Sequence, residues 1–194
     1  MNDSEYRYLK RGGRAFRMSR DEVVAVLTQA DAPLCEAVID FQVRFGGYVW
    51  TDLTLGLFFP DGLGLKPTAP NGSIRDGRHF FECAHRNISQ ICYEIDEAGQ
   101  IFEEYRPSAE SFESLIADHA YVETVLSQQD WKHIPEDRLA TKRFQGFFDE
   151  SELTKVPQAS DAYRQVLRGD DLVCIRFGEH SRLFVTPDRA KSLK

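Results

Sequence analysis

The sequence predicts an α+β fold, and three observations support this prediction. Apolar residues with helical spacing at 31–45 end in a double glycine, which is followed by a run rich in β-forming residues. The runs 90–95 and 100–105 flank a four-residue turn that contains glycine, which is typical of a β-hairpin. A second helical pattern follows at 112–126. Helices and a hairpin in one chain favour a mixed fold.

Length and composition indicate an ordinary globular protein. A chain of 194 residues can bury one sizeable core, so we expect a single domain, 1–194. No run approaches the roughly 18 apolar residues of a membrane helix, and the start has no apolar stretch typical of a signal peptide. Cys35, Cys83, Cys92 and Cys174 are scattered without paired spacing, which suits reduced thiols. We therefore expect a cytoplasmic protein that does not associate with membranes.

The first elements can be placed from local signals. Tyr6–Phe16 is predicted to be a loose arm or an edge segment. Ser19 and Glu22 have the spacing of a capping box, in which serine and glutamate satisfy backbone N–H groups at a helix start. This predicts a helix of about eleven residues that ends near Asp31.

The stretch 31–50 is predicted to be the central element of the fold. Pro33 suits a first helical turn, and the apolar stripe that follows consists of Leu34, Ala37, Val38, Phe41 and Phe45. Gly46-Gly47 is expected to end the helix, because glycine readily adopts the left-handed conformation of a helix terminus. Residues 48–59 then continue as one β-rich run. The residues assigned a structural role here and below are Phe41, Phe45, Gly46, Gly47, Trp50, Gly99 and Phe112.

The middle of the chain is predicted to be mainly β-structure. Residues 60–76 are rich in glycine and proline and read as a surface loop. Strands are predicted at 78–86, 90–95 and 100–105, with a tight turn at Asp96–Gly99 and an end at Pro107. Ser108 or Ser111 would cap the next helix, whose apolar face comprises Phe112, Leu115, Ile116, His119, Val122 and Leu126.

The last third of the chain is less regular. Residues 130–135 read as a break, and 136–155 as helical or irregular with mixed charge. A short helix is predicted at 161–168. A final hairpin is expected from 172–177 and 182–186, around residues 178–181.

Charge is unevenly distributed in a chain whose net charge is −7. Residues 1–20 hold six basic residues, whereas 94–123 hold nine acidic residues against Arg106 alone. An acidic stretch of this density repels nucleic acid and favours a basic protein partner. The alternative interpretation is a solvated sheet edge and helix face.

Three constellations could carry chemistry. His79, Cys83, His85 and Cys92 are residue types that bind zinc, but they lack the close paired spacing of structural zinc sites. A Cys83–His119 nucleophile pair has no flanking motif. Glu94 could oppose Glu103 or Glu104 across a hairpin as an acid/base pair, although such pairs arise by chance in an acidic stretch. We therefore predict no catalytic residue, no metal and no cofactor.

Four short motifs follow one another in a recognisable order: Phe41-xxx-Phe45-Gly46-Gly47, Tyr93-Glu94-Ile95-Asp96, Gly99-Gln100-Ile101-Phe102 and Ser111-Phe112-Glu113-Ser114-Leu115-Ile116. In this order they resemble the SUKH superfamily of bacterial immunity proteins, which are related to a fungal cell-wall assembly regulator. The resemblance covers residues 20–127, and 130–194 would be a C-terminal extension packed on or beside this core. The sequence departs from the family where Pro33-Leu34 replaces the usual Leu-Pro.

The resemblance implies a curved, mostly antiparallel sheet flanked by helices, and the local signals after residue 130 add a C-terminal helix and hairpin. It also implies a non-enzymatic protein that binds and neutralises a cognate toxin domain, for which a basic nuclease would be a suitable partner. A regulatory or scaffold protein on the same fold is the alternative. The residues expected to meet the partner are Glu94, Asp96, Glu97, Glu103, Glu104, Glu110 and Glu113.

Overall fold

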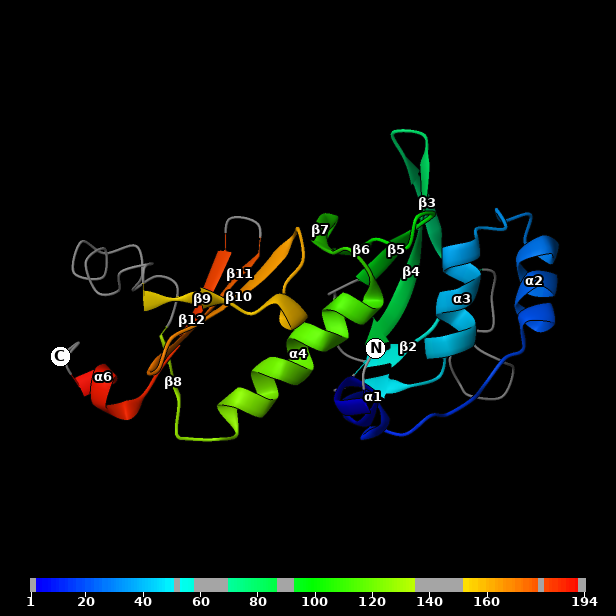
Figure 1. Ribbon diagram of the computed structural model, residues 1–194. Helices are drawn as coiled ribbons and strands as arrows, with labels where there is room; N and C mark the ends of the chain where they lie inside the picture. The colour runs from blue at the N-terminus through cyan, green and yellow to red at the C-terminus, as the bar shows by residue number, and fades with distance from the viewer. Residues whose placement is uncertain are drawn as a thin grey trace. The chain divides into compact units, whose positions relative to one another are not determined.

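The computed structural model of the chain divides into two compact units, Met1–Phe112 and Glu113–Lys194. Each unit combines helices with an antiparallel sheet, so the predicted α+β class is confirmed (Figure 1). The predicted single domain with a core at 20–127 and an extension at 130–194 stays a prediction. The structure describes residues 3–50, 53–57, 70–86, 93–134, 152–177 and 180–191.

The first unit begins with three helices, α1 (Asp3–Lys10), α2 (Arg20–Gln29) and α3 (Glu36–Phe45). Helix α1 replaces the predicted loose arm. Helix α2 starts at the predicted capping box, in which the Glu22 N–H donates to Ser19 and the Ser19 N–H donates to Glu22.

Helix α3 is shorter than predicted. It begins after Cys35, so Pro33 and Leu34 precede it, and the Leu34 side chain is 54% exposed rather than part of the core. The prediction that Pro33 lies in the first helical turn was wrong, because the chain is still extended at Cys35. The helix ends at Gly46, where Arg14 donates hydrogen bonds to the carbonyls of Gly46 and Val43.

The first sheet contains seven strands, and every pair is antiparallel. Their order is β1-β2-β4-β5-β6-β7, with β3 also paired to β4, and the sheet is curled. The β3–β4 hairpin extends beyond the other strands (Figure 1). The strands are β1 (Val49–Trp50), β2 (Leu53–Leu55), β3 (Gly72–Arg75), β4 (Arg78–Arg86), β5 (Tyr93–Asp96), β6 (Ile101–Glu103) and β7 (Arg106–Ala109).

Two strand predictions in this unit were wrong in detail. The run 48–59 is not one strand, because Val49 pairs with Thr54 and the chain reverses between β1 and β2. Pro107 does not end the β-structure, since it lies within β7. Strand β7 is at the edge of the sheet, and an edge strand tolerates a proline that cannot donate a hydrogen bond to a further neighbour.

The predicted turn at Asp96–Gly99 is confirmed. It joins β5 to β6, and Gly99 has a φ of +90°, the left-handed region that favours glycine. The double glycine after α3 has a similar role, because Gly47 has a φ of +86°. A Cβ atom on Gly47 would lie 2.2 Å from the backbone oxygen of Phe16, so a side chain has no room there.

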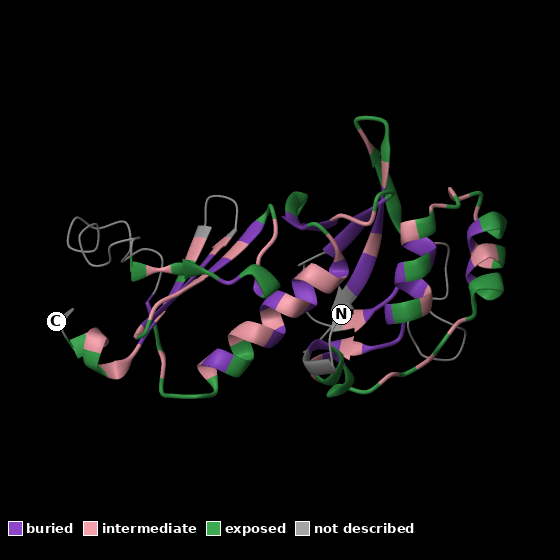
Figure 2. Ribbon diagram, viewed as in Figure 1, coloured by how far each residue is buried: buried purple, intermediate pink, exposed green. Residues whose placement is uncertain are grey.

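Aromatic rings fill the core of the first unit. Phe112 lies 5.2 Å from Phe41, 4.7 Å from Phe45 and 5.9 Å from Trp50 between ring centroids. All four side chains are buried. Buried residues also line β4 and β5, beside α3 (Figure 2). Burial of this aromatic area supplies much of the apolar stabilisation of the unit.

The second unit contains most of helix α4 (Phe112–Leu126) and a five-stranded antiparallel sheet in the order β8-β12-β11-β10-β9. Val125 on α4 packs with Val156, Val166 and Val173, and a second cluster includes Leu172 and Leu183. The other elements are β8 (Lys132–Ile134), β9 (Thr154–Lys155), a 3₁₀ turn (Pro157–Ala159), β10 (Arg164–Arg168), β11 (Leu172–Phe177), β12 (His180–Val185) and α6 (Pro187–Lys191).

The final hairpin is confirmed as β11 and β12, whereas the helix predicted at 161–168 was wrong. Residues 164–168 form β10, in which Arg164 and Val166 are buried with the two-residue period of a strand. Pairing of the whole of β10 with β11 favours the strand. The predicted break at 130–135 contains β8, and residues 135–151 lie outside the described residues.

Candidate interaction surface

The acidic stretch that begins at Glu94 divides into inward and outward carboxylates. Glu94 and Asp96 on β5 are buried and pair with arginines of the β3–β4 hairpin. The Glu94 carboxylate lies 2.7 Å from the Arg75 guanidinium, and the Asp96 carboxylate lies 3.1 Å from that of Arg78. These two charges are neutralised within the sheet, so they do not contribute to an exposed acidic surface.

Asp96 also organises its own turn. Its Oδ1 accepts hydrogen bonds from the N–H groups of Ala98 at 3.0 Å and Gln100 at 2.9 Å. With Oδ2 on Arg78, both oxygens are occupied, which accounts for a residue that is only 1% exposed. The Asp96 carboxylate therefore stabilises the β5–β6 turn.

The other acidic residues face outwards to different degrees. Glu97, Glu104 and Glu110 are exposed, and Glu97 also accepts a hydrogen bond from the His79 N–H. Glu103 is half-buried, and the Ser108 hydroxyl donates to it at 3.5 Å. Glu113 is half-buried in the first turn of α4 and belongs to the second unit. Within the acidic stretch, the exposed acids of the first unit therefore lie at the β5–β6 and β6–β7 turns and just after β7.

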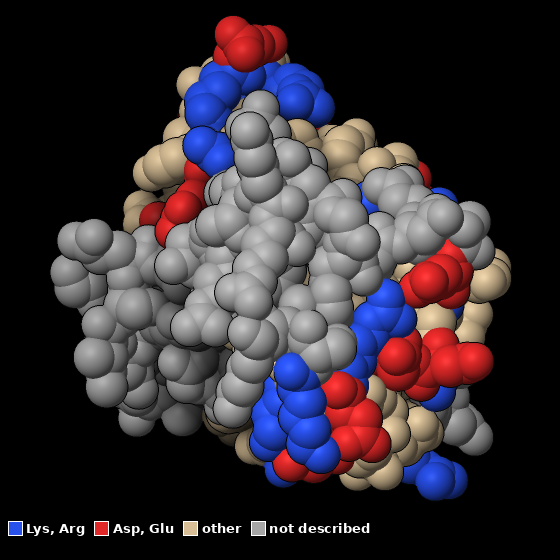
Figure 3. All heavy atoms as spheres, turned by 90° about the vertical axis from the view of Figure 1, so that its left-hand side faces the viewer, with Lys and Arg blue, Asp and Glu red and all other residues tan. Residues whose placement is uncertain are grey.

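A stack of arginine and aromatic side chains lies beside these turns. The Arg75 guanidinium is 3.7 Å from the Phe80 ring centroid and 5.0 Å from that of Tyr105. Tyr105 is 72% exposed, the largest value among the exposed large hydrophobic residues that the structure describes. On the face drawn in Figure 3, which is the left-hand side of Figure 1, acidic and basic side chains lie close together instead of forming a field of one sign.

The second unit contains a buried cluster that joins α4 to β10. Arg164 lies 2.7 Å from the Asp118 carboxylate and 3.1 Å from the Nε2 of His119. Burial raises the pKa of Asp118, and Arg164 opposes this rise. Desolvation lowers the pKa of His119 to about 3, helped by Arg164 and Arg182. The imidazole is therefore neutral at pH 7 and its Nε2 faces a donor, so the cluster fastens the helix to the sheet.

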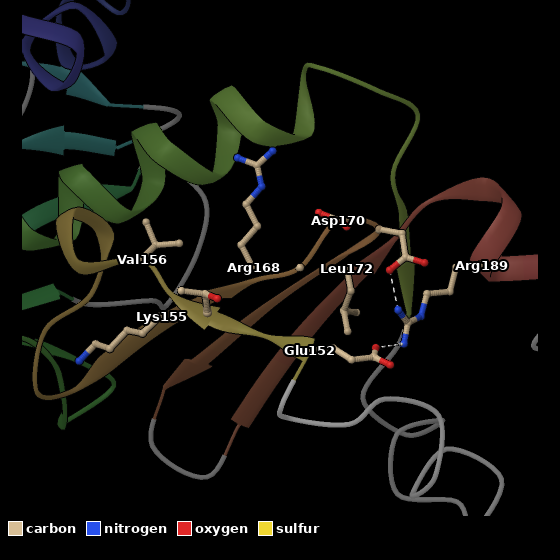
Figure 4. Close-up of a pocket in the computed structure, with 10 residues that line it drawn as sticks. Glu152, Lys155, Val156, Arg168, Asp170, Leu172 and Arg189 are labelled. Carbon is tan, nitrogen blue, oxygen red and sulfur yellow. Dashed lines mark hydrogen bonds and ion pairs between the residues drawn. The ribbon is translucent and has the colours of Figure 1, made fainter.

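A cavity of about 720 Å³ lies in the second unit between β9, the β10–β11 turn and α6 (Figure 4). Arg189 is held there by Asp171 and Glu152, the latter at 2.9 Å. The Lys155 and Arg168 side chains point away from Arg189. The charged groups that line the cavity pair with one another or point in different directions, so they do not converge on a ligand.

Among the described residues, neither the zinc constellation nor the acid/base pair considered above is assembled. Cys83 is the extra residue of a β-bulge, so the regular alternation of β4 is interrupted between it and His79. Within the described ranges no group of three His, Cys, Asp or Glu residues is placed to hold a metal, and the side chains of His85 and Cys92 lie outside those ranges. Glu94 faces Phe102 rather than Glu103. Cys83 and His119 belong to different units, so the absence of a nucleophile pair stays a prediction.

Comparisons with known proteins do not place the chain in a family: no family model, no curated protein and no solved structure matches it. Among the helices that the structure describes, none is long and apolar enough to cross a membrane. The geometry defines an α+β protein, and the exposed acidic turns of its first unit are its candidate interaction surface.

Sequence reasoning missed two features of the site. Tyr105 was assigned to the end of a strand, because Glu104-Tyr105 has no turn signature. Asp118 was omitted from the α4 face, although a charged residue three positions after the apolar Leu115 is a signal that a buried partner is needed.

Proposed function

We propose that the protein is a non-enzymatic immunity protein of the SUKH type, which binds and neutralises a cognate bacterial toxin domain in the cytoplasm. One observation carries the proposal: Glu97, Glu104 and Glu110 remain exposed on the first unit, while Glu94 and Asp96 are neutralised internally. Exposed like charges steer a partner of the opposite sign towards the surface and repel nucleic acid. The proposed partner is therefore a basic protein, for which a nuclease domain is a suitable candidate.

The product of the gene adjacent to this one is the natural protein with which to test the proposal. Its association with the purified protein would be followed over a salt series. The test variant carries Glu97→Lys, Glu104→Lys and Glu110→Lys. A matched control carries Asp21→Lys, Asp40→Lys and Asp170→Lys, which reverses the same number of charges at exposed positions elsewhere.

The proposal predicts that the test variant associates at least about tenfold more slowly at low salt, with a weaker dependence on salt, while the control stays within about twofold of the wild type. Equal slowing of both variants would mean that only the net charge matters. No complex between the wild type and the adjacent gene product would contradict the immunity role and favour a regulatory or scaffold protein.

A further inference from the structure

The β6–β7 turn has a backbone geometry that its residues do not favour. Glu103 pairs with Arg106, so Glu104 and Tyr105 are the two residues of the loop. Their φ values are +50° and +67°, the left-handed region that two-residue hairpins require at both positions. Asparagine, aspartate and glycine adopt this region easily, whereas a bulky side chain is strained there by about 1–2 kcal/mol.

The packing of the turn compensates little of this strain. Tyr105 is largely exposed, and it contacts the Arg75 guanidinium, which lies 5.0 Å from its ring centroid. Glu104 is exposed as well. Strained backbone that the core does not require is a feature of binding and catalytic sites.

The Arg75 side chain of β3 contacts the tyrosine ring from the sheet. The guanidinium packs on Phe80 and is fixed by the Glu94 carboxylate at 2.7 Å. Its Nη1 atom is buried and has no hydrogen-bond acceptor within the described part of the chain. An exposed aromatic ring that is oriented before binding loses little conformational entropy when a partner arrives.

From this geometry we propose that Tyr105 and Glu104 anchor a basic protein partner at the β6–β7 turn. A tyrosine ring attracts an arginine or lysine through its face, and Glu104 beside it offers a carboxylate to the same cation. Tyrosine is also among the residues that contribute most to protein interfaces. The inference rests on the proposed function for the class of partner, and it adds the contact point.

A basic probe tests the anchor directly. A hexa-arginine peptide would be titrated at low ionic strength into the full chain, with binding followed by NMR shifts of the Tyr105 ring and the Glu104 amide. The variants are Tyr105→Ala and Tyr105→Phe, which keeps the ring, and Tyr163→Ala is the control at an exposed tyrosine of the second unit.

The anchor predicts that the largest shifts occur at Tyr105 and Glu104. Affinity should fall about fivefold in Tyr105→Ala and stay within about twofold in the other two variants. Unchanged affinity in Tyr105→Ala, with shifts spread evenly over the acidic residues, would overturn it. Failure of the immunity proposal is a separate result, since it is the absence of a complex with the adjacent gene product. Peptide binding at Tyr105 without that complex keeps the anchor and rejects the toxin partner.

Discussion

The turns of the β3–β4 and β6–β7 hairpins of the first sheet have the same backbone geometry but are formed by different residue types. Asp76 and Gly77 form the first turn with φ values of +50° and +76°, and Glu104 and Tyr105 form the second with +50° and +67°. Asp-Gly is among the sequences best suited to this geometry, whereas Glu-Tyr is not. The residues of the second turn are therefore not those that would make the turn most stable.

The same contrast separates the carboxylates of the acidic stretch. Asp96 is enclosed by its own turn and by Arg78, so its charge stabilises the fold. Its neighbour Glu97 is exposed. Position in an acidic run thus says little about role, because Asp96 ends a strand whose four residues are all buried, whereas Glu97 lies in the exposed turn that follows. The variants below test this distinction between groups that serve the fold and groups that face outwards.

The largest effect is expected from removal of the buried carboxylate. Asp96→Ala leaves two backbone N–H groups and Arg78 without their acceptor, which should lower the free energy of unfolding by about 3 kcal/mol. Glu97→Ala is the matched control, and because it removes only the exposed hydrogen bond from the His79 N–H, it should lower stability by no more than about 1 kcal/mol. Urea denaturation of both variants measures the difference. Equal losses would show that the two carboxylates are not distinct in role.

Glycine substitutions should separate strain from crowding. Gly99→Val forces a β-branched residue to a φ of +90° and places its Cβ 3.0 Å from the Cβ of Ala37, so we expect a loss of about 2–3 kcal/mol. Gly77→Val, at a φ of +76° with nothing within 4 Å, should lose only about 1–2 kcal/mol. Thermal melting compares the two. A smaller loss for Gly99→Val would contradict the packing at the β5–β6 turn.

In the second unit, His119 of the buried cluster and the exposed His133 allow a similar comparison, through the pH dependence of stability. The folded-state pKa of His119 is lowered to about 3 from 6.5, so its contribution to stability is complete above pH 6.5 and falls as the pH drops towards 3. Between pH 7 and pH 5 the loss should be about 2 kcal/mol. His119→Gln keeps an acceptor for Arg164 but does not titrate.

Denaturation of His119→Gln at pH 7 and pH 5 should therefore show less pH dependence than the wild type. His133→Gln, at an exposed position of β8, should retain the wild-type dependence. A pH profile that is the same in the wild type and His119→Gln would mean that the imidazole is not desolvated by the cluster.

Elements with strong local signals were predictable from the sequence. The capping box at Ser19, the glycines that end α3 and the Gly99 turn each act through the chain nearby, and each was predicted. Residues 161–168 were not, because their apolar spacing fits a helix as well as a strand. Pairing with β11, the next strand along the chain, decides in favour of the strand, and the apolar spacing within 161–168 does not reveal that partner.

The candidate site was predictable only in outline. The acidic stretch is evident in the sequence, but the burial of Glu94 and Asp96 depends on Arg75 and Arg78, which belong to other strands. Tyr105 was not predicted as a turn residue, because Glu-Tyr is not a sequence typical of turns. A site defined by such a departure is visible only once the backbone is known.

Replacement of the β6–β7 turn by a well-suited sequence tests the central claim most directly. In Glu104→Asn/Tyr105→Gly, relief of two positive φ values outweighs the lost Arg75 contact, so the free energy of unfolding should rise by about 1 kcal/mol. Binding of hexa-arginine peptide by the same variant should fall about fivefold or more. Higher stability together with weaker binding is the predicted result. Lower stability, or binding equal to that of the wild type, would contradict the claim that this turn is retained for recognition.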